Sequence, residues 1–187
     1  MYILRMIMKK QLLLLVMMGL PLVANADAVE INGIYYNLIA KGNVAEVTSN
    51  PNKYTGSVVI PEAVSYQDVS YSVTSIGKAA FNNCPGLTSV TIPNCVTKID
   101  DRAFEYCSGL TSITIPNSVT TMGVNAFANS GLTSITIPNS LTTLNSYTFA
   151  WCIHLTSITI PNSVTCIGEY NQEIKGKTNV EIIPVSA

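Results

Sequence analysis

Five cysteines and one histidine are the side chains of this sequence best suited to nucleophilic or metal chemistry. They are Cys84, Cys95, Cys107, Cys152, Cys166 and His154. A serine or cysteine nucleophile needs a base that a third group orients, but no acidic residue lies between Glu105 and Glu169. Structural zinc sites draw on closely spaced cysteines and histidines, and the sequence contains no C-x-x-C pair. We therefore expect neither a nucleophilic enzyme nor a zinc site.

Asp100 and Asp101 form a carboxylate pair, the arrangement that acid–base catalysis would need. Adjacent residues on an exposed bend do not hold two carboxyl groups at the fixed separation that glycoside hydrolysis requires. Solvated turn residues are the simpler interpretation. Because no glycine-rich phosphate loop occurs either, the sequence predicts no enzyme and no cofactor.

Three of the cysteines stand at one position of a repeat, three residues after a phenylalanine. They are Cys84, Cys107 and Cys152, and the third repeat, which is one residue shorter, is expected to lack this position. Free cysteine is among the most buried residue types. An exported protein can form disulfides, but the odd number and the repeat-phased spacing do not resemble a disulfide framework. Buried free thiols are therefore favoured over disulfides.

The elements that position these side chains recur at a nearly constant interval. LTSITIPNSVT occurs at 110–120 and again at 155–165, with near copies at 87–97 and 132–142. The leading leucines are 23, 22 and 23 residues apart. A second motif keeps a similar step at Phe81, Phe104, Phe127 and Phe149. A fixed period of this length indicates a solenoid of stacked rungs, each rung being one coil of the chain.

Each rung is predicted to contain one strand, one turn and one short helical or 3₁₀ segment. In LTSITIP the isoleucines alternate with serine and threonine, the pattern of a half-buried strand, and the proline ends the strand. The segment at 125–130 has room for about one helical turn, with Phe127 packed inward. We therefore predict an α/β solenoid, a right-handed superhelix with short parallel strands and about 23 residues per rung.

The full repeat, L-x-x-I-x-I-P-x-x-V-x-x-I-x-x-x-A-F-x-x-C, resembles the leucine-rich repeat of the BspA type, which is found in surface and secreted proteins of bacteria and some protists. The match covers about residues 74–168. The resemblance implies a leucine-rich-repeat arc with parallel strands on its concave face. It also implies the function proposed for such proteins, adhesion to host extracellular-matrix proteins or to other cells.

The N-terminal region departs from the repeat. Basic residues, an apolar run from Leu12 to Val23 and the small residues ANA predict a secretory signal peptide over residues 1–26. The apolar run is shorter than the roughly 20 residues of a membrane-spanning helix. Residues 27–56 are predicted to form an N-terminal β-hairpin cap. We therefore expect a secreted or cell-surface protein without a transmembrane segment after cleavage.

The remaining chain divides into repeats and a decayed end. Residues 57–168 are predicted to be leucine-rich repeats, and the first rung carries a hairpin insertion near 65–73. A last strand is expected at NVEIIP, because Pro184 follows Pro161 by 23 residues. Residues 169–187 are either a degenerate terminal rung that caps the stack or a truncated end, since terminal repeats are atypical in both cases.

Charge excludes one class of partner. Without residues 1–26 the chain has seven basic and eleven acidic side chains, a net charge of −4, and no Asp, Glu, Lys or Arg occurs from Tyr106 to Gly168. Nucleic-acid binding needs clustered lysine and arginine. We therefore expect no nucleic-acid partner, and a monomer that binds a protein or glycan on a cell surface or matrix.

The candidate concave binding face consists of three uncharged columns of hydroxyl side chains, about 4.8 Å apart from rung to rung. It comprises Thr88, Ser89, Thr91, Thr111, Ser112, Thr114, Thr133, Ser134, Thr136, Thr156, Ser157 and Thr159. Each hydroxyl can donate and accept hydrogen bonds. Alternatively, these residues only keep an exposed sheet soluble, because identical residues in every repeat carry little specific information.

Tyr106 and Trp151, which share a repeat column with Asn83, are the candidate rim contacts. Tyrosine and tryptophan present a large apolar body with a polar end, although such residues are often partly buried at edges. Together these features predict an exported, non-enzymatic leucine-rich-repeat binding module that adheres to host matrix proteins, glycans or neighbouring cells. The alternative is a structural spacer, or a fragment of a larger repeat surface protein, without its own ligand.

Overall fold

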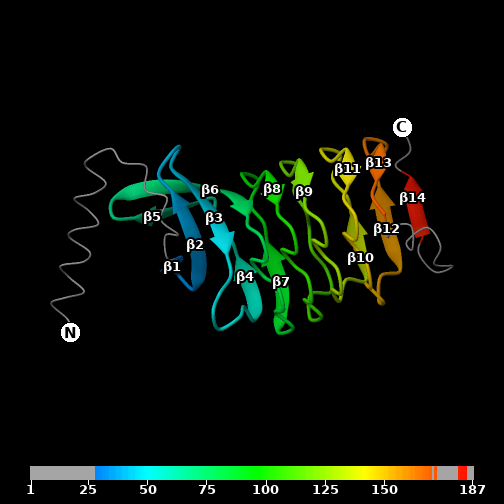
Figure 1. Ribbon diagram of the computed structural model, residues 1–187, viewed down its shortest axis with the longest axis horizontal. Helices are drawn as coiled ribbons and strands as arrows, with labels where there is room; N and C mark the ends of the chain where they lie inside the picture. The colour runs from blue at the N-terminus through cyan, green and yellow to red at the C-terminus, as the bar shows by residue number, and fades with distance from the viewer. Residues whose placement is uncertain (1–27, 170, 172–180, 185–187) are drawn as a thin grey trace.

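The computed structural model describes residues 28–169, 171 and 181–184. The predicted signal peptide lies outside the described residues. Successive rungs lie side by side along the long axis of the molecule, from β1 at one end to β14 at the other (Figure 1). None of the described residues belongs to a helix long and apolar enough to cross a membrane.

Fourteen strands make up the regular structure of the described residues. Those before the repeats are β1 (Val29–Ile31), β2 (Ile34–Ile39), β3 (Val44–Thr48), β4 (Gly56–Val59), β5 (Ala63–Tyr66) and β6 (Val69–Ile76). Those of the repeats are β7 (Leu87–Thr91), β8 (Lys98–Ile99), β9 (Thr121–Met122), β10 (Ser134–Thr136), β11 (Thr143–Leu144), β12 (Ser157–Ile160), β13 (Cys166–Ile167) and β14 (Glu181–Pro184).

Strands of neighbouring rungs pair in parallel, with equivalent residues of the repeat opposite each other. Ser134 of β10 lies opposite Ser157 of β12. The two-residue strands that follow the prolines form a second ladder, in which β8 pairs with β9 and β11 pairs with β13. The repeat phrase therefore presents the same side-chain types from rung to rung, whereas the second ladder places Lys98 opposite Thr121 and Thr143 opposite Cys166.

A column of phenylalanine rings forms the centre of the core. The ring centroids of Phe81 and Phe104 are 5.0 Å apart, those of Phe104 and Phe127 are 5.1 Å apart, and both pairs are nearly parallel at 4°. Phe149 continues the column at 5.7 Å from Phe127, and Tyr54 begins it at 4.7 Å from Phe81. All five side chains are buried. Offset parallel stacking is a favourable geometry for aromatic pairs.

The predicted helical or 3₁₀ segment, and with it the α/β class, is wrong for the described residues, which form strands and turns only. Around Phe104 the backbone is left-handed at Arg102 (φ 57°) and at Tyr106 (φ 61°). A positive φ interrupts a right-handed helix. The freed N–H groups of Phe104 and Tyr106 instead donate to the carbonyls of Ala126 and Ala128 in the next rung, at 2.7 and 2.9 Å.

The repeat phrase at 110–116 forms no regular strand, although its near copies form β7, β10 and β12. The N–H of Thr133 donates to the carbonyl of Thr111 at 3.0 Å, but this bond is not extended into a strand pair. The step from Leu110 to Leu132 is one residue shorter than the next step. The sheet of the repeat phrase is consequently divided into β4–β7 and β10–β12–β14.

The third repeat retains the cysteine position, contrary to expectation. Ser130 stands three residues after Phe127 and is buried, and its hydroxyl lies 3.3 Å from the Cys152 sulfur. The shorter repeat therefore lacks the residue that follows this position. Cys84, Cys107 and Cys152 are free and buried, as predicted, whereas Cys95 is half-buried and Cys166 is exposed.

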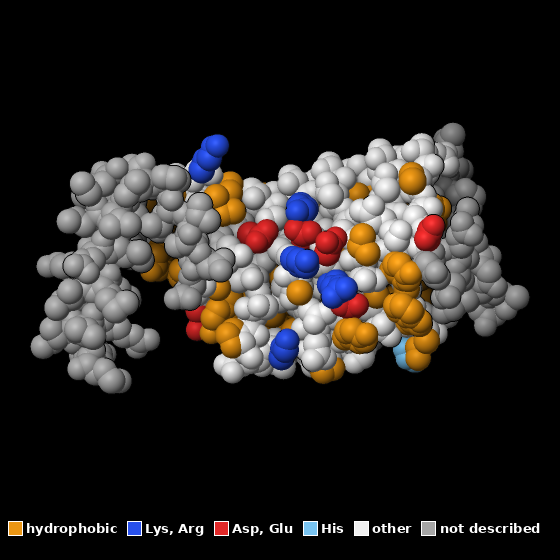
Figure 2. All heavy atoms as spheres, viewed as in Figure 1, with side chains coloured by type: hydrophobic (Ala, Val, Ile, Leu, Met, Phe, Trp, Pro, Cys, Tyr) orange, Lys and Arg blue, Asp and Glu red, His pale blue; other side chains and the backbone are white. Residues whose placement is uncertain are grey.

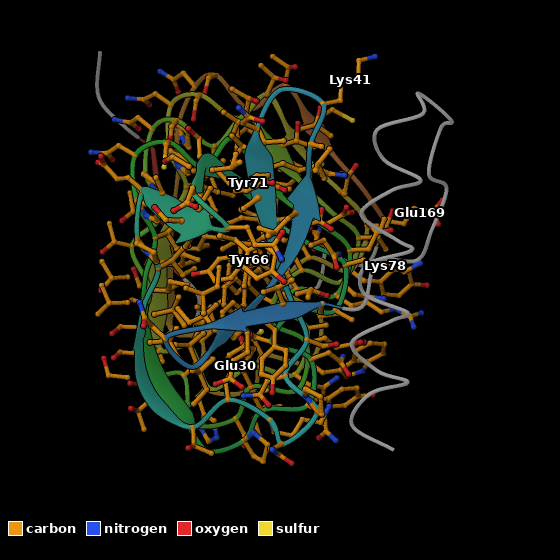
Figure 3. All side chains as sticks on the ribbon, turned by 90° about the vertical axis from the view of Figure 1, so that its left-hand side faces the viewer. Glu30, Lys41, Tyr66, Tyr71, Lys78 and Glu169 are labelled. Atoms are coloured by element: carbon orange, nitrogen blue, oxygen red, sulfur yellow. The ribbon has the colours of Figure 1, made fainter. Side chains whose placement is uncertain are left out.

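The N-terminal segment contains three strands where a two-stranded hairpin was expected. Asn32 (φ 52°) and Gly33 (φ 83°) form a turn that separates β1 from β2. β1 and β2 pair antiparallel, as do β2 and β3, and β3 pairs in parallel with β6. Left-handed residues Gln67 and Asp68 connect β5 to β6, which also pair antiparallel. Figure 3 looks onto this end of the molecule.

The C-terminal strand is displaced by one residue from the predicted alignment. β14 pairs in parallel with β12, and Ile160 rather than Pro161 lies opposite Pro184. Asn171 occupies the position at which alanine precedes three of the four phenylalanines, and it is buried. Its side-chain carbonyl accepts the N–H of Phe149 at 3.3 Å, and its amide donates to the carbonyl of Asn145.

Replacing Phe104 with alanine is expected to lower the free energy of unfolding by about 3–5 kcal/mol, because it removes a buried ring from the middle of the column. Urea denaturation measures this change. The control is Tyr106→Asn at an exposed position, which is expected to stay within about 0.5 kcal/mol of wild type. A loss below about 1 kcal/mol for Phe104→Ala would show that the column does not hold the rungs.

Gly131→Ala is expected to cost about 1–3 kcal/mol, because the new methyl group would collide with the backbone carbonyl of Ser108 in the rung before. Gly86 occupies the same repeat position, but there the nearest atom to a new methyl group would be in the side chain of Thr55, at 3.0 Å. Gly86→Ala is thus the matched control, with a smaller expected loss. Equal thermal destabilisation by the two substitutions would contradict the close approach of rungs at Gly131.

Candidate binding face

A shallow groove of about 880 Å³ runs along the repeat phrase from β7 to β12. Val90, Ile92, Ile113, Ile115 and Ile135 contribute its apolar floor. Its polar lining consists of hydroxyl and amide side chains and contains no charged residue. The polar lining residues are Ser89, Thr91, Asn94, Ser112, Thr114, Asn117, Ser134, Thr136, Ser157 and Thr159. The groove is therefore a neutral surface with hydrogen-bonding groups at each level.

Eight of the twelve hydroxyl residues predicted for the concave face line this groove. The other four, Thr88, Thr111, Thr133 and Thr156, do not. These threonines directly follow the buried leucines, ahead of the alternation that begins at the serine of each phrase. The hydroxyl of Thr156 donates to the carbonyl of Thr133 at 3.1 Å, and that of Thr133 donates to the carbonyl of Thr111 at 3.3 Å. This column connects neighbouring rungs.

Further hydroxyls that the sequence did not single out also join neighbouring rungs. The hydroxyls of Thr97 and Thr120 donate to the carbonyls one rung earlier at 3.3 and 3.4 Å. Ser118 and Ser140, in the IPNS phrase, donate to the carbonyls of Val96 and Val119 at 2.7 and 2.5 Å. The signal for this role is the recurrence of a hydroxyl beside the core valine or leucine of each repeat. Much of the repeated hydroxyl content therefore stabilises the stack.

Asn94 and Asn117 are groove residues that the sequence interpretation passed over. They follow the proline in the IPN phrase, so their repetition was the available signal. Their side chains carry both donors and acceptors. Ser89, at the N-terminal end of the groove, already donates its hydroxyl to the hydroxyl of Ser57 in β4, at 2.8 Å.

The titratable residues considered for chemistry take part in structural contacts. Asp100 lies 2.6 Å from the ammonium of Lys98. Burial acts to raise the pKa of Asp100, but the hydrogen bonds from Lys98 and from the Asp101 N–H outweigh it and lower the pKa. The carboxylate of Asp101 accepts the N–H of Val124 at 2.9 Å. Among the described residues, no three His, Cys, Asp or Glu side chains are grouped to hold a metal ion.

The buried thiols are poor nucleophiles. Burial, together with the nearby Cys84, raises the pKa of Cys107 to about 12. The Cys107 thiol donates to the carbonyl of Phe81 at 3.0 Å, and the Cys152 thiol donates to the carbonyl of Phe127 at 3.1 Å. Because the thiolate is the reactive form, these side chains serve as small core groups.

The candidate rim residues lie outside the groove, on the turns that carry the phenylalanines. Tyr106 is 50% exposed and Trp151 is 53% exposed. Both adopt a left-handed backbone, as do Asn83 and Asn129 in the same column. This conformation costs most residues roughly 1–2 kcal/mol, and asparagine adopts it more readily. Tyr106 and Trp151 are therefore not the residues that the backbone would favour.

Trp151 has an aromatic neighbour that the sequence interpretation did not identify. The rings of Tyr147 and Trp151 stack with centroids 6.0 Å apart and planes inclined by 20°. Tyr147 also has a left-handed backbone, with φ 60°. In Figure 2 the charged side chains gather over the middle of the visible face, and a group of hydrophobic side chains lies toward the C-terminal rungs.

Comparison with known proteins identifies the repeat. A profile of the BspA type leucine-rich repeat region matches residues 74–183, in six copies. None of the curated proteins matches the chain. A leucine-rich repeat protein from Bacteroides ovatus ATCC 8483 is 27% identical, with 76% of this chain and 49% of that chain covered and a TM-score of 0.49. This chain thus spans about half of that protein.

Two further solved structures share the fold. The T. pallidum leucine-rich repeat protein is 16% identical, with 85% of this chain and 100% of that chain covered and a TM-score of 0.56. The pneumococcal vaccine antigen PcpA is 20% identical, with 76% and 46% covered and a TM-score of 0.50. Since the profile also spans more than half of the sequence, the chain belongs to the BspA-type leucine-rich-repeat family.

Proposed function

We propose that this protein is an exported, non-enzymatic binding module that adheres to macromolecules of a host matrix or a neighbouring cell. The observation that carries the proposal is the neutral groove along four successive repeat phrases. Its hydroxyl and amide groups alternate with buried apolar residues, so each level adds donors and acceptors without adding charge. The groove suits an elongated partner that follows the stack.

The chemistry of the groove favours contact and hydrogen bonding over electrostatic attraction. No Asp, Glu, Lys or Arg occurs between Tyr106 and Gly168, so the central and C-terminal parts of the groove have no ionised lining. Charged rims mainly accelerate association and make it sensitive to salt. We therefore infer a partner whose bound surface is itself largely uncharged.

Two observations support a location at the cell surface or in the medium. The family resemblance is to surface and secreted proteins, and PcpA, which shares the fold, is a vaccine antigen. The predicted signal peptide at residues 1–26 agrees with this location. An exported protein with a free groove is in a position to contact matrix components or other cells.

The spacer alternative has its own support. Hydroxyls of five described threonines and serines beside the core valines and Leu141 donate to backbone carbonyls of the previous rung, so repetition alone strengthens the stack. The chain also spans about half of the Bacteroides ovatus protein. In this alternative the repeats hold another part of a longer surface protein away from the cell and bind no ligand themselves.

Substituting Thr114, Thr136 and Thr159 together by lysine is expected to abolish saturable binding to matrix proteins, because three ammonium groups would line a neutral groove. Solid-phase binding of the full chain, expressed with its own N-terminus, to fibronectin, fibrinogen, laminin and collagen measures this effect. The matched control places the same charge outside the groove, at Thr121, Thr143 and Cys166, a repeat column in which the chain already has Lys98. It is expected to bind as wild type does.

Two outcomes would contradict the proposal. If the folded wild-type chain binds none of the matrix proteins and no intact cells, the spacer alternative is favoured. If both triple-lysine variants lose binding equally while circular dichroism shows that both are folded, the added charge acts through the whole surface, and the groove is not the binding site.

A further inference from the structure

The half-buried Tyr147 and the exposed Trp151 stack on each other outside the groove. The two residues flank the buried Phe149, two positions before and two after it. Their rings are nearly parallel, and a centroid separation of 6.0 Å means that they are laterally offset. The pair therefore presents a stepped surface longer than one ring.

The backbone conformation does not favour aromatic residues at these two positions. The preceding rung has Asn125 (φ 58°) and Asn129 (φ 54°) at the same two positions. Tyr147 and Trp151 adopt the same left-handed backbone, with φ 60° and 57°. Asparagine enters this conformation more easily than aromatic residues do. Since the preceding rung forms with asparagine, the turn itself does not require aromatic residues, and their type is open to a role in recognition.

The described surroundings of the pair are largely apolar. Ile153, two residues further on, is 75% exposed and extends the apolar surface. No Asp, Glu, Lys or Arg lies within the sequence from Tyr106 to Gly168. Glu169, whose backbone carbonyl accepts the N–H of Tyr147 at 3.1 Å, places a negative charge in the adjoining rung. Because that charge is negative, an anionic partner is disfavoured beside the aromatic pair.

The size of the surface selects among neutral partners. The aromatic pair and Ile153 span seven residues of a single rung, and Tyr106 lies two rungs away. A stable protein interface buries roughly 800 Å² on each partner, which is more than three side chains provide. A flat ligand the size of one or two rings matches the surface better.

We propose that Tyr147 and Trp151 form a binding platform for a neutral glycan, on which one face of a pyranose ring stacks. The C–H bonds of that face carry small positive charges and approach the negative faces of the aromatic rings. The hydroxyl groups at the edge of the sugar remain directed toward water and toward the half-buried Asn129 in the neighbouring rung. This site adds a sugar contact to the proposed adhesive groove but does not depend on it.

The fluorescence of Trp151 provides a direct test, because it is the only tryptophan in the chain. The full chain is titrated with oligomers of β-glucan, α-glucan, mannan, galactan and N-acetylglucosamine, and with a hyaluronan oligomer as the anionic probe. A saturable change in emission with at least one neutral oligomer, and none with hyaluronan, is expected. No change with any neutral oligomer, or a response to hyaluronan alone, would overturn the proposal.

Asparagine substitutions separate binding from folding. Tyr147→Asn keeps the fluorescent reporter and is expected to weaken binding roughly 3- to 10-fold through loss of one ring. Trp151→Asn, followed by calorimetry, is expected to remove measurable binding. Both variants should melt no lower than wild type, because Asn125 and Asn129 show that the backbone accommodates asparagine. Tyr106→Asn, in the same column but two rungs away, is the control with unchanged affinity.

Three results would reject the platform. Unchanged affinity in Tyr147→Asn would exclude stacking on the pair. Loss of sugar binding in the triple-lysine groove variant, together with full binding in Trp151→Asn, would place the sugar in the groove and leave the adhesive function intact. A concentration-dependent dimer of the wild type that Trp151→Asn abolishes would assign the aromatic surface to a second copy of this chain.

Discussion

Contact between neighbouring rungs is the constraint on which the structure depends. Within a turn such as that around Phe104, the N–H groups of Phe104 and Tyr106 find their acceptors one rung away. The phenylalanine rings stack in the same direction, and so do the hydroxyl-to-carbonyl bonds of the repeat threonines. A single rung would leave these groups unpaired, so stability arises from the interfaces between rungs. This explains why the chain repeats one phrase almost unchanged.

The same constraint separates architectural positions from positions free to carry recognition. Thr133 and Thr156 repeat because their hydroxyls join rungs, and this accounts for repetition without a ligand. The side chains that line the groove recur from rung to rung, mostly without such a bond. Together they form a neutral surface. At Trp151, by contrast, an aromatic residue stands where two of the other three rungs have asparagine, at no benefit to the backbone. A residue that differs from those of the other rungs is more specific evidence of recognition than a residue that is repeated in every rung.

Much of the fold could be predicted, because the repeat period and the alternation of apolar and polar residues both follow from the stacking of rungs. The family resemblance, the parallel pairing of equivalent residues and the buried thiols are confirmed. The helical segment was wrong because left-handed residues on both sides of each phenylalanine redirect the N–H groups, and Asn125 and Asn129 were the available signal. The missing strand at 110–116 depends on the register between rungs, which no local pattern encodes. Spatial proximity, as between Tyr147 and Trp151, was hidden for the same reason.

Amide hydrogen exchange of the full chain, resolved by residue with NMR, tests the dependence on neighbouring rungs most directly. The account predicts that the amides of Phe104 and Tyr106, which donate to the next rung, exchange only through global unfolding. Phe104→Ala should then accelerate exchange in the rungs on both sides together. Independent local opening of single rungs, or protection that stays unchanged in the neighbours of Phe104→Ala, would contradict it.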